Sequence, residues 1–118
     1  MSVDRRMLSL AATIAYEGCS RHDNRSFHLG AVGMRNDGVI VSARNIAATD
    51  VTPEAHAEAR VVRKLTLDSY VWVARVSKGT REWAMARPCK NCQRRMKTAG
   101  VRKVMYTIGP NEWGTILL

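Results

Sequence analysis

Four side chains in two short stretches have the types and spacing of a metal-dependent hydrolytic site. His56 precedes Glu58 by two residues in EAHAEARVV, and Cys89 precedes Cys92 by three residues in PCKNC. Zinc accepts imidazole nitrogen and thiolate sulfur in tetrahedral geometry, and three protein ligands leave its fourth position to water. Zinc brings the pKa of such a water close to neutrality, and a carboxylate beside it can transfer the proton. The pattern predicts His56, Cys89 and Cys92 as zinc ligands and Glu58 as the catalytic residue.

Both stretches fall at the start of a predicted helix. Thr52 can cap one helix, whose first residue is a proline, a residue suited to that position. The other helix begins near Pro88 and stops at Gly100. Within it Cys89 and Cys92, three residues apart, share one face. The two helix starts could therefore present their ligands to a single ion.

The rest of the chain predicts an α/β fold that can hold these two helices. Apolar residues at helical spacing predict a first helix over 3–17. β-prone runs predict strands over 28–35, 38–44, 69–76 and 102–108, with a hairpin at Asp37-Gly38 and a short antiparallel strand in the tail. Strands reached through a helix lie parallel in one sheet. We expect one domain over 1–118, a three-layer α/β/α sandwich with a mixed sheet of four to five strands, and a ligand site at the sheet edge where the helices begin.

Composition places the chain among single-domain proteins of a reducing compartment. It has 118 residues, 46% of them hydrophobic, and no apolar run near the length of a membrane span. The N-terminal apolar residues follow helical spacing and Glu17 interrupts them, so we do not expect a signal peptide. Three cysteines, two of them in C-x-x-C, form a poor disulfide framework. A cytoplasmic location is the expectation.

Positive charge is concentrated in the second half of the chain. The net charge is +9, but residues 1–59 carry six Lys/Arg against seven Asp/Glu, whereas residues 60–118 carry thirteen against three. Such asymmetry favours an anionic partner. The charge alone does not distinguish a nucleotide from a polymer, and a solvated basic surface is the alternative.

The two motifs, in this order and with Pro88 before the first cysteine, resemble the cytidine and deoxycytidylate deaminase superfamily. The resemblance covers about residues 28–107, and HLGAVGMRNDGVIVSARN is similar to the family's first hairpin. It implies zinc as cofactor and Glu58 as the proton shuttle. The implied reaction is hydrolytic deamination at C4 of cytosine or C6 of adenine.

The resemblance also implies substrate contacts. Asn45 stands where family members place an asparagine that contacts the sugar or base, and backbone groups around Ala57 and Pro88 would hold the pyrimidine edge. The segment VSKGTREWAMAR before the second motif is longer than in many members and predicts an extra turn or small hairpin. Trp83 within it is a candidate for stacking on a base, and packing of the loop is an equal alternative. The antiparallel last strand that we expect differs from the parallel one usual in the nucleotide and polynucleotide branches.

Three functions compete on this evidence. The first is deamination of a free cytosine-bearing nucleotide or nucleoside, favoured by the compact length, with Arg25, Lys78, Arg81 or Arg87 holding a phosphate. The second is a deaminase of single-stranded DNA or RNA, favoured by the basic second half but poor in stacking aromatics. The third is a structural zinc site, which the presence of Glu58 and only three ligands argues against. We favour the first, with a homo-oligomer as the expected assembly and no membrane association.

Overall fold

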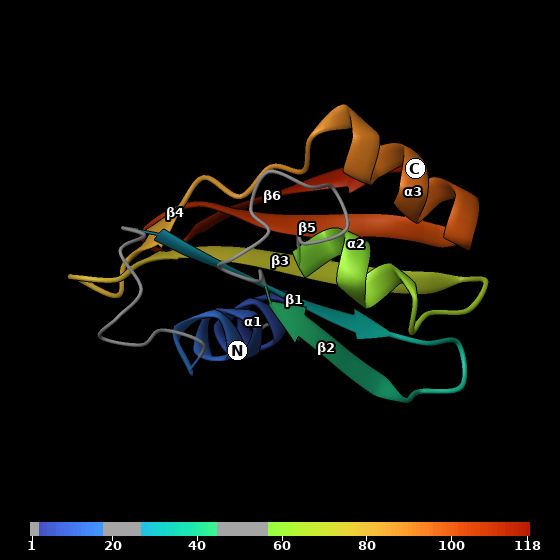
Figure 1. The fold of residues 1–118 in the computed structure, drawn as a ribbon, viewed down its shortest axis with the longest axis horizontal. Helices are drawn as coiled ribbons and strands as arrows, with labels where there is room; N and C mark the ends of the chain where they lie inside the picture. The colour runs from blue at the N-terminus through green and yellow to red at the C-terminus, as the bar shows by residue number, and fades with distance from the viewer. Residues whose placement is uncertain (1–2, 18–26, 45–56) are drawn as a thin grey trace.

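One mixed sheet of six strands with helices on its two faces forms the structure (Figure 1). The computed structural model describes residues 3–17, 27–44 and 57–118. The helices are α1 (Val3–Glu17), α2 (Ala57–Val62) and α3 (Lys90–Ala99). The strands are β1 (Phe27–Met34), β2 (Ile40–Arg44), β3 (Ser69–Ser77), β4 (Trp83–Ala84), β5 (Val101–Gly109) and β6 (Glu112–Leu117). None of the helices in the described ranges is both long and apolar enough to cross a membrane.

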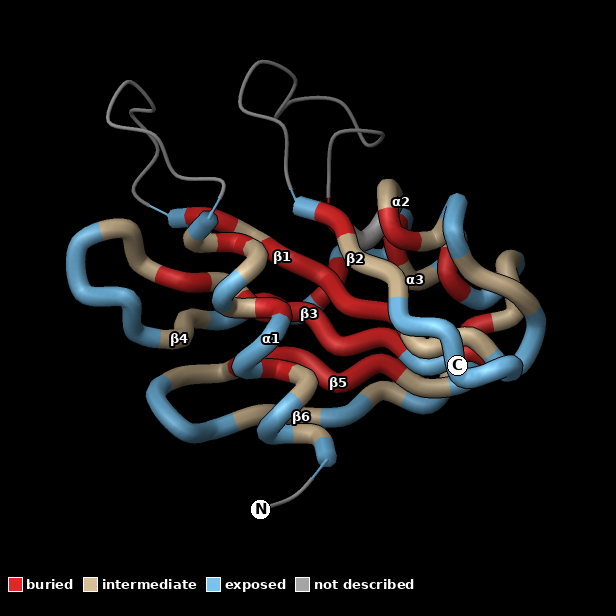
Figure 2. Tube along the Cα trace, turned by 90° about the horizontal axis from the view of Figure 1, so that it is seen from below, coloured by how far each residue is buried: buried red, intermediate tan, exposed pale blue. Residues whose placement is uncertain are grey.

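The two faces of the sheet are covered by different helices, because side chains alternate along each strand. In β3, Val71 and Val73 belong to the core cluster beneath α2 and α3, whereas Trp72 and Ala74 pack on the α1 side. Burial follows the central strands β1, β3 and β5 and fades toward the outer strand β6 (Figure 2). The predicted three-layer α/β/α sandwich is confirmed.

α1 lies very close to β1, and a glycine makes this approach possible. A Cβ on Gly30 would stand 2.2 Å from the carbonyl oxygen of Ala11 and 2.8 Å from the backbone nitrogen of Ala15. At the other end of the helix, the Trp72 indole N–H donates to the Asp4 carboxylate at 3.0 Å. Close packing and one hydrogen bond therefore fix α1 on its face of the sheet.

Strand directions bring the starts of α2 and α3 to one edge of the sheet. The strand order is β2-β1-β3-β5-β6, with β4 paired to β3. β1 is antiparallel to both β2 and β3, and β3 is parallel to β5, so β2, β3 and β5 all end at the same edge. Along the chain, α2 follows β2, and α3 follows β3 through the β4 segment. Both helices therefore start at the edge where these strands end, which is the edge where ligands bind in open α/β sheets.

The first four long strands, the first helix and the last helix begin and end within two residues of their predicted bounds. The antiparallel last strand is confirmed, since β6 pairs antiparallel with β5. The predicted sheet of four to five strands has six instead. The additional strand is β4, a two-residue strand that pairs antiparallel with β3. It lies in the segment before Pro88 where an extra turn or small hairpin is expected.

Candidate metal centre

The start of α3 is built on the side chain of its first predicted zinc ligand. Cys89 is the N-cap, with extended backbone, and its sulfur accepts a hydrogen bond from the Cys92 backbone N–H at 3.5 Å. The Gln93 backbone N–H donates to the Cys89 carbonyl at 2.9 Å and closes the first turn. Gly100 ends the helix in the left-handed conformation. The C-x-x-C motif is therefore wound into one turn at the helix N-terminus.

The two cysteines differ in exposure in a way that suits a bound ion at the molecular edge. Cys92 is fully buried in the core cluster under α2 and α3, whereas Cys89 is exposed. Thiolate is the form that coordinates zinc. The chemistry of these two donors therefore fits zinc, with one cysteine buried and the other exposed.

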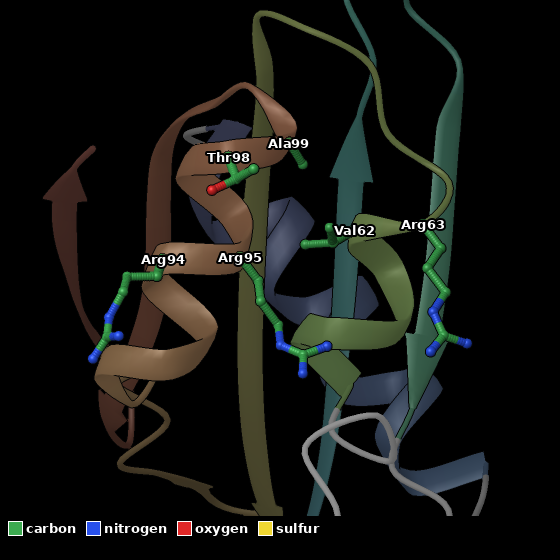
Figure 3. Close-up of a pocket in the computed structure, with 6 residues that line it drawn as sticks. All are labelled: Val62, Arg63, Arg94, Arg95, Thr98 and Ala99. Atoms are coloured by element: carbon green, nitrogen blue, oxygen red, sulfur yellow. The ribbon is translucent and has the colours of Figure 1, made fainter.

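α2 lies beside α3 and runs in the same direction (Figure 3). Ala57, its first residue, is fully buried, and Val61 one turn later packs in the same core cluster as Cys92. The predicted ligand His56 and the predicted contact Asn45 lie outside the described residues, as does the side chain of Glu58. The described part of the chain contains no group of three or more His, Cys, Asp or Glu side chains that could hold a metal. The structure thus brings together the two cysteines and the helix that carries Glu58.

The segment that leads into Cys89 is held by a buried threonine that the sequence does not single out. Thr107 on β5 is fully buried. Its hydroxyl accepts from the Arg75 backbone N–H at 3.1 Å and donates to the Ala84 carbonyl at 2.7 Å. Its carbonyl accepts from the Ala86 N–H at 2.9 Å. One residue therefore connects β3, β4 and β5 directly before the metal motif.

Pro88 and Arg87 are fixed in the same short segment. Pro88 is buried, and its carbonyl accepts from the Gln93 side-chain amide at 2.9 Å. Arg87 is exposed, and its guanidinium donates to the hydroxyl of buried Tyr106 at 3.3 Å. No local pattern in the sequence indicates that Tyr106 or Gln93 helps to fix this segment. Tyr106 lies on β5, far along the chain from Arg87, and Gln93 reaches Pro88 across the first turn of α3. Arg87 is the predicted phosphate contact that lies next to the metal motif.

The structure does not bring Trp83 to the cysteines. Its ring meets the ring of Trp113 edge-to-face, with centroids 6.5 Å apart. Both rings pack against the core cluster on the α1 side, whereas Cys92 belongs to the cluster on the opposite face. The second interpretation of Trp83, in which it packs the loop, matches this position.

The sequence matches the family model of the cytidine and deoxycytidylate deaminase zinc-binding region over residues 1–108. The chain belongs to the cytidine and deoxycytidylate deaminase family. The match includes both halves of the candidate metal centre, the start of α2 and the start of α3. No curated protein sequence matches significantly.

Solved structures of family enzymes share this fold. The cytidine deaminase from Burkholderia pseudomallei is 18% identical, with 99% of this chain and 93% of that chain covered and a TM-score of 0.64. The cytidine deaminase from Mycobacterium leprae is also 18% identical, covers 98% and 94%, and has a TM-score of 0.59. The one from Mycobacterium tuberculosis is 22% identical, covers 92% and 90%, and has a TM-score of 0.55. At these identities the likeness is one of fold.

Proposed function

We propose that this deaminase-family protein hydrolyses the exocyclic amine of a free cytosine nucleoside or nucleotide and releases ammonia. The observation that carries the proposal is the C-x-x-C turn at the start of α3, beside α2, at the edge where β3 and β5 end. In the reaction one water adds its oxygen to ring carbon C4. The C4–N bond breaks, one proton of that water ends on ring nitrogen N3, and the other leaves with the amine as ammonia.

Zinc would be held by Cys89, Cys92 and His56. When bound, it supplies an activated water at neutral pH. The position of both cysteines in one turn at the start of α3 supports this ligand set, because zinc accepts sulfur ligands. The exposed position of Cys89 supports access to the ion from outside. Three protein ligands are the number typical of a catalytic zinc site.

The remaining steps fall to the side chains and backbone of the chain. Glu58 would take one proton from the attacking water and deliver it to the ring nitrogen, and would then move the second proton of that water to the leaving amine. Backbone groups at Ala57 and Pro88 would hold the pyrimidine edge, and Asn45 would contact the sugar or base. The hydrogen bond from Gln93 to the Pro88 carbonyl supports a rigid wall at this position. Such rigidity keeps the substrate in a reactive orientation.

The last strand supports a free nucleoside over a nucleotide or a polymer within this substrate class. β6 runs antiparallel to β5, whereas the resemblance associates a parallel last strand with the nucleotide and polynucleotide branches. The position of Trp83 on the α1 side points the same way, because the chain then lacks its best predicted stacking platform. We therefore propose cytidine or deoxycytidine as the first substrates to test, with deoxycytidylate next.

An ammonia-release assay on a substrate panel tests the proposal. The panel holds cytidine, deoxycytidine, dCMP, dCTP, cytosine, adenosine and single-stranded DNA. Glu58→Gln should retain stoichiometric zinc and lose turnover by about 10²-fold or more, because general acid–base transfer contributes about that much. Glu82→Gln, a change of the same type at an exposed residue outside the predicted site, should keep full activity. Full activity of Glu58→Gln, or zinc absent from the purified protein, would overturn the proposal.

A further inference from the structure

Two adjoining grooves cross the outer surface of the helical layer and share Arg94. The first, of about 360 Å³, lies between α2 and α3 (Figure 3). The second, of about 380 Å³, lies between α3 and the end of β6. The first is lined by Val62, Arg63, Arg94, Arg95, Thr98 and Ala99. The second is lined by Lys90, Gln93, Arg94, Lys97, Ile116, Leu117 and Leu118.

The grooves form one basic strip, which we define by Arg63, Arg95, Arg94, Lys90 and Lys97. None of the described residues that line either groove is Asp or Glu. Within the described part of the chain, Arg63 and Arg94 form no ion pair, whereas Arg35 pairs with Asp37 and Arg102 with Asp68. Arg63 and Arg94 therefore carry positive charge that no carboxylate among the described residues neutralises.

This arrangement is unfavourable for α3 itself. Lys90 and Arg94 are four residues apart and Arg94 and Lys97 three apart, so like charges neighbour each other on the helix surface. Lys90 also stands in the first turn, where the helix dipole disfavours a cation, and α3 contains no acidic residue to compensate. A bound polyanion would relieve both effects. The basic residues thus lower the stability of α3 slightly, and a bound polyanion would offset this effect.

The guanidinium groups form a row and do not converge on one point. In Figure 3 the Arg95 side chain lies between the two helices, with Arg94 on the far side of α3 and Arg63 on the far side of α2. The second groove continues the row beyond Arg94 to Lys90 and Lys97. A single phosphate cannot reach all five groups, whereas a chain of phosphates can follow the row.

We propose that the basic strip binds a chain of phosphate groups, the backbone of a polynucleotide or an inorganic polyphosphate, independently of base sequence. Arginine is suited to phosphate because its planar fork donates two parallel hydrogen bonds. No aromatic side chain lines either groove among the described residues, so contacts to phosphates dominate over base stacking. Phosphate-chain binding does not require deaminase activity. A negative result in the binding assay would not affect the proposed deaminase function, and the reverse also holds.

Salt-dependent binding of a labelled 20-nucleotide oligo-dT, followed by fluorescence anisotropy, tests the proposal. If all five basic residues contact phosphates, log K falls with log salt with a slope of about −3.5, since each contact contributes about 0.7 on a single strand. Arg63→Gln/Arg94→Gln removes two contacts and should change the slope to about −2.1. Raising salt from about 50 to 200 mM then weakens binding about 130-fold for the wild type and about 18-fold for the double variant.

The matched control is Arg6→Gln/Arg102→Gln, which removes the same charge from exposed positions outside the strip. It should keep the wild-type slope, and both double variants should keep the wild-type melting temperature within a few degrees. Unlabelled polyphosphate that displaces oligo-dT identifies the phosphate chain alone as sufficient, whereas displacement only by nucleic acid identifies the polynucleotide as the source. Equal slopes for the two double variants, absence of binding at 50 mM salt, or equal competition by polyglutamate would overturn the proposal.

Discussion

Thr107→Val removes a buried hydroxyl at nearly constant volume and should destabilise the protein through hydrogen bonds alone. The Arg75 N–H and the Ala84 carbonyl both lose their partner at this hydroxyl. A hydrogen bond contributes about 0.5–1.5 kcal/mol net, and a buried donor left unsatisfied costs about 1–3 kcal/mol. The free energy of unfolding should fall by about 2–4 kcal/mol. For 118 residues this corresponds to a melting temperature about 8–16 °C lower, since unfolding entropy is about 2.1 cal/mol/K per residue.

Urea and thermal unfolding measure this effect, and two variants control it. Thr107→Ser keeps the hydroxyl and removes a buried methyl, so it should cost about 1 kcal/mol. Thr115→Val makes the same change at an exposed position of β6 and should stay within about 0.5 kcal/mol of the wild type. If Thr107→Ser proves more destabilising than Thr107→Val, the hydroxyl does not bridge β3 and β4, and the positioning role of Thr107 is refuted.

Three further perturbations test the packing and the metal centre. Gly30→Ala should destabilise by about 1–3 kcal/mol or more, seen in urea unfolding, because its methyl would displace α1; wild-type stability would show that α1 does not pack this closely. Zinc at 100 times its Kd should raise the free energy of unfolding by about 2.7 kcal/mol over chelated protein. Cys92→Ala should abolish this response and Cys19→Ser, outside the predicted ligand set, should retain it; a zinc response in Cys92→Ala would remove Cys92 from the ligands. Trp83→Phe should lower stability by about 1 kcal/mol through lost ring contacts and leave the KM for nucleoside unchanged, whereas a raised KM at unchanged stability would restore the stacking role.

The parts of the fold that rest on local periodicity could be predicted from the sequence. The first helix matches over all of Val3–Glu17 because its apolar residues recur at one spacing. The parallel pairing of β3 and β5 follows from the helix between them. The C-x-x-C turn at the start of α3 likewise follows from Pro88 and from the three-residue spacing.

Contacts between distant residues could not be predicted in this way. Thr107 bonds to residues 32 and 23 positions away, and nothing in VMYTIG marks its hydroxyl. Trp83 could face either side of the sheet, and the two-residue pairing of β4 with β3 decides which one. Its charge marks Arg87 as a candidate phosphate contact, but its partner Tyr106 is defined only by the register of β5. Tertiary pairing therefore decides the surroundings of residues whose chemistry the sequence already indicates.

The antiparallel direction of β6 decides at which edge of the sheet a segment fused to Leu118 would lie. The Leu118 N–H donates to the Arg102 carbonyl at 3.0 Å, so the chain comes back to the edge where β5 starts. This is the edge opposite the starts of α2 and α3 (Figure 1). An affinity tag or fused domain placed there would leave the mouth of the candidate metal centre unobstructed. It would instead crowd the groove between α3 and β6, so tag-free protein is the appropriate material for measuring phosphate-chain binding.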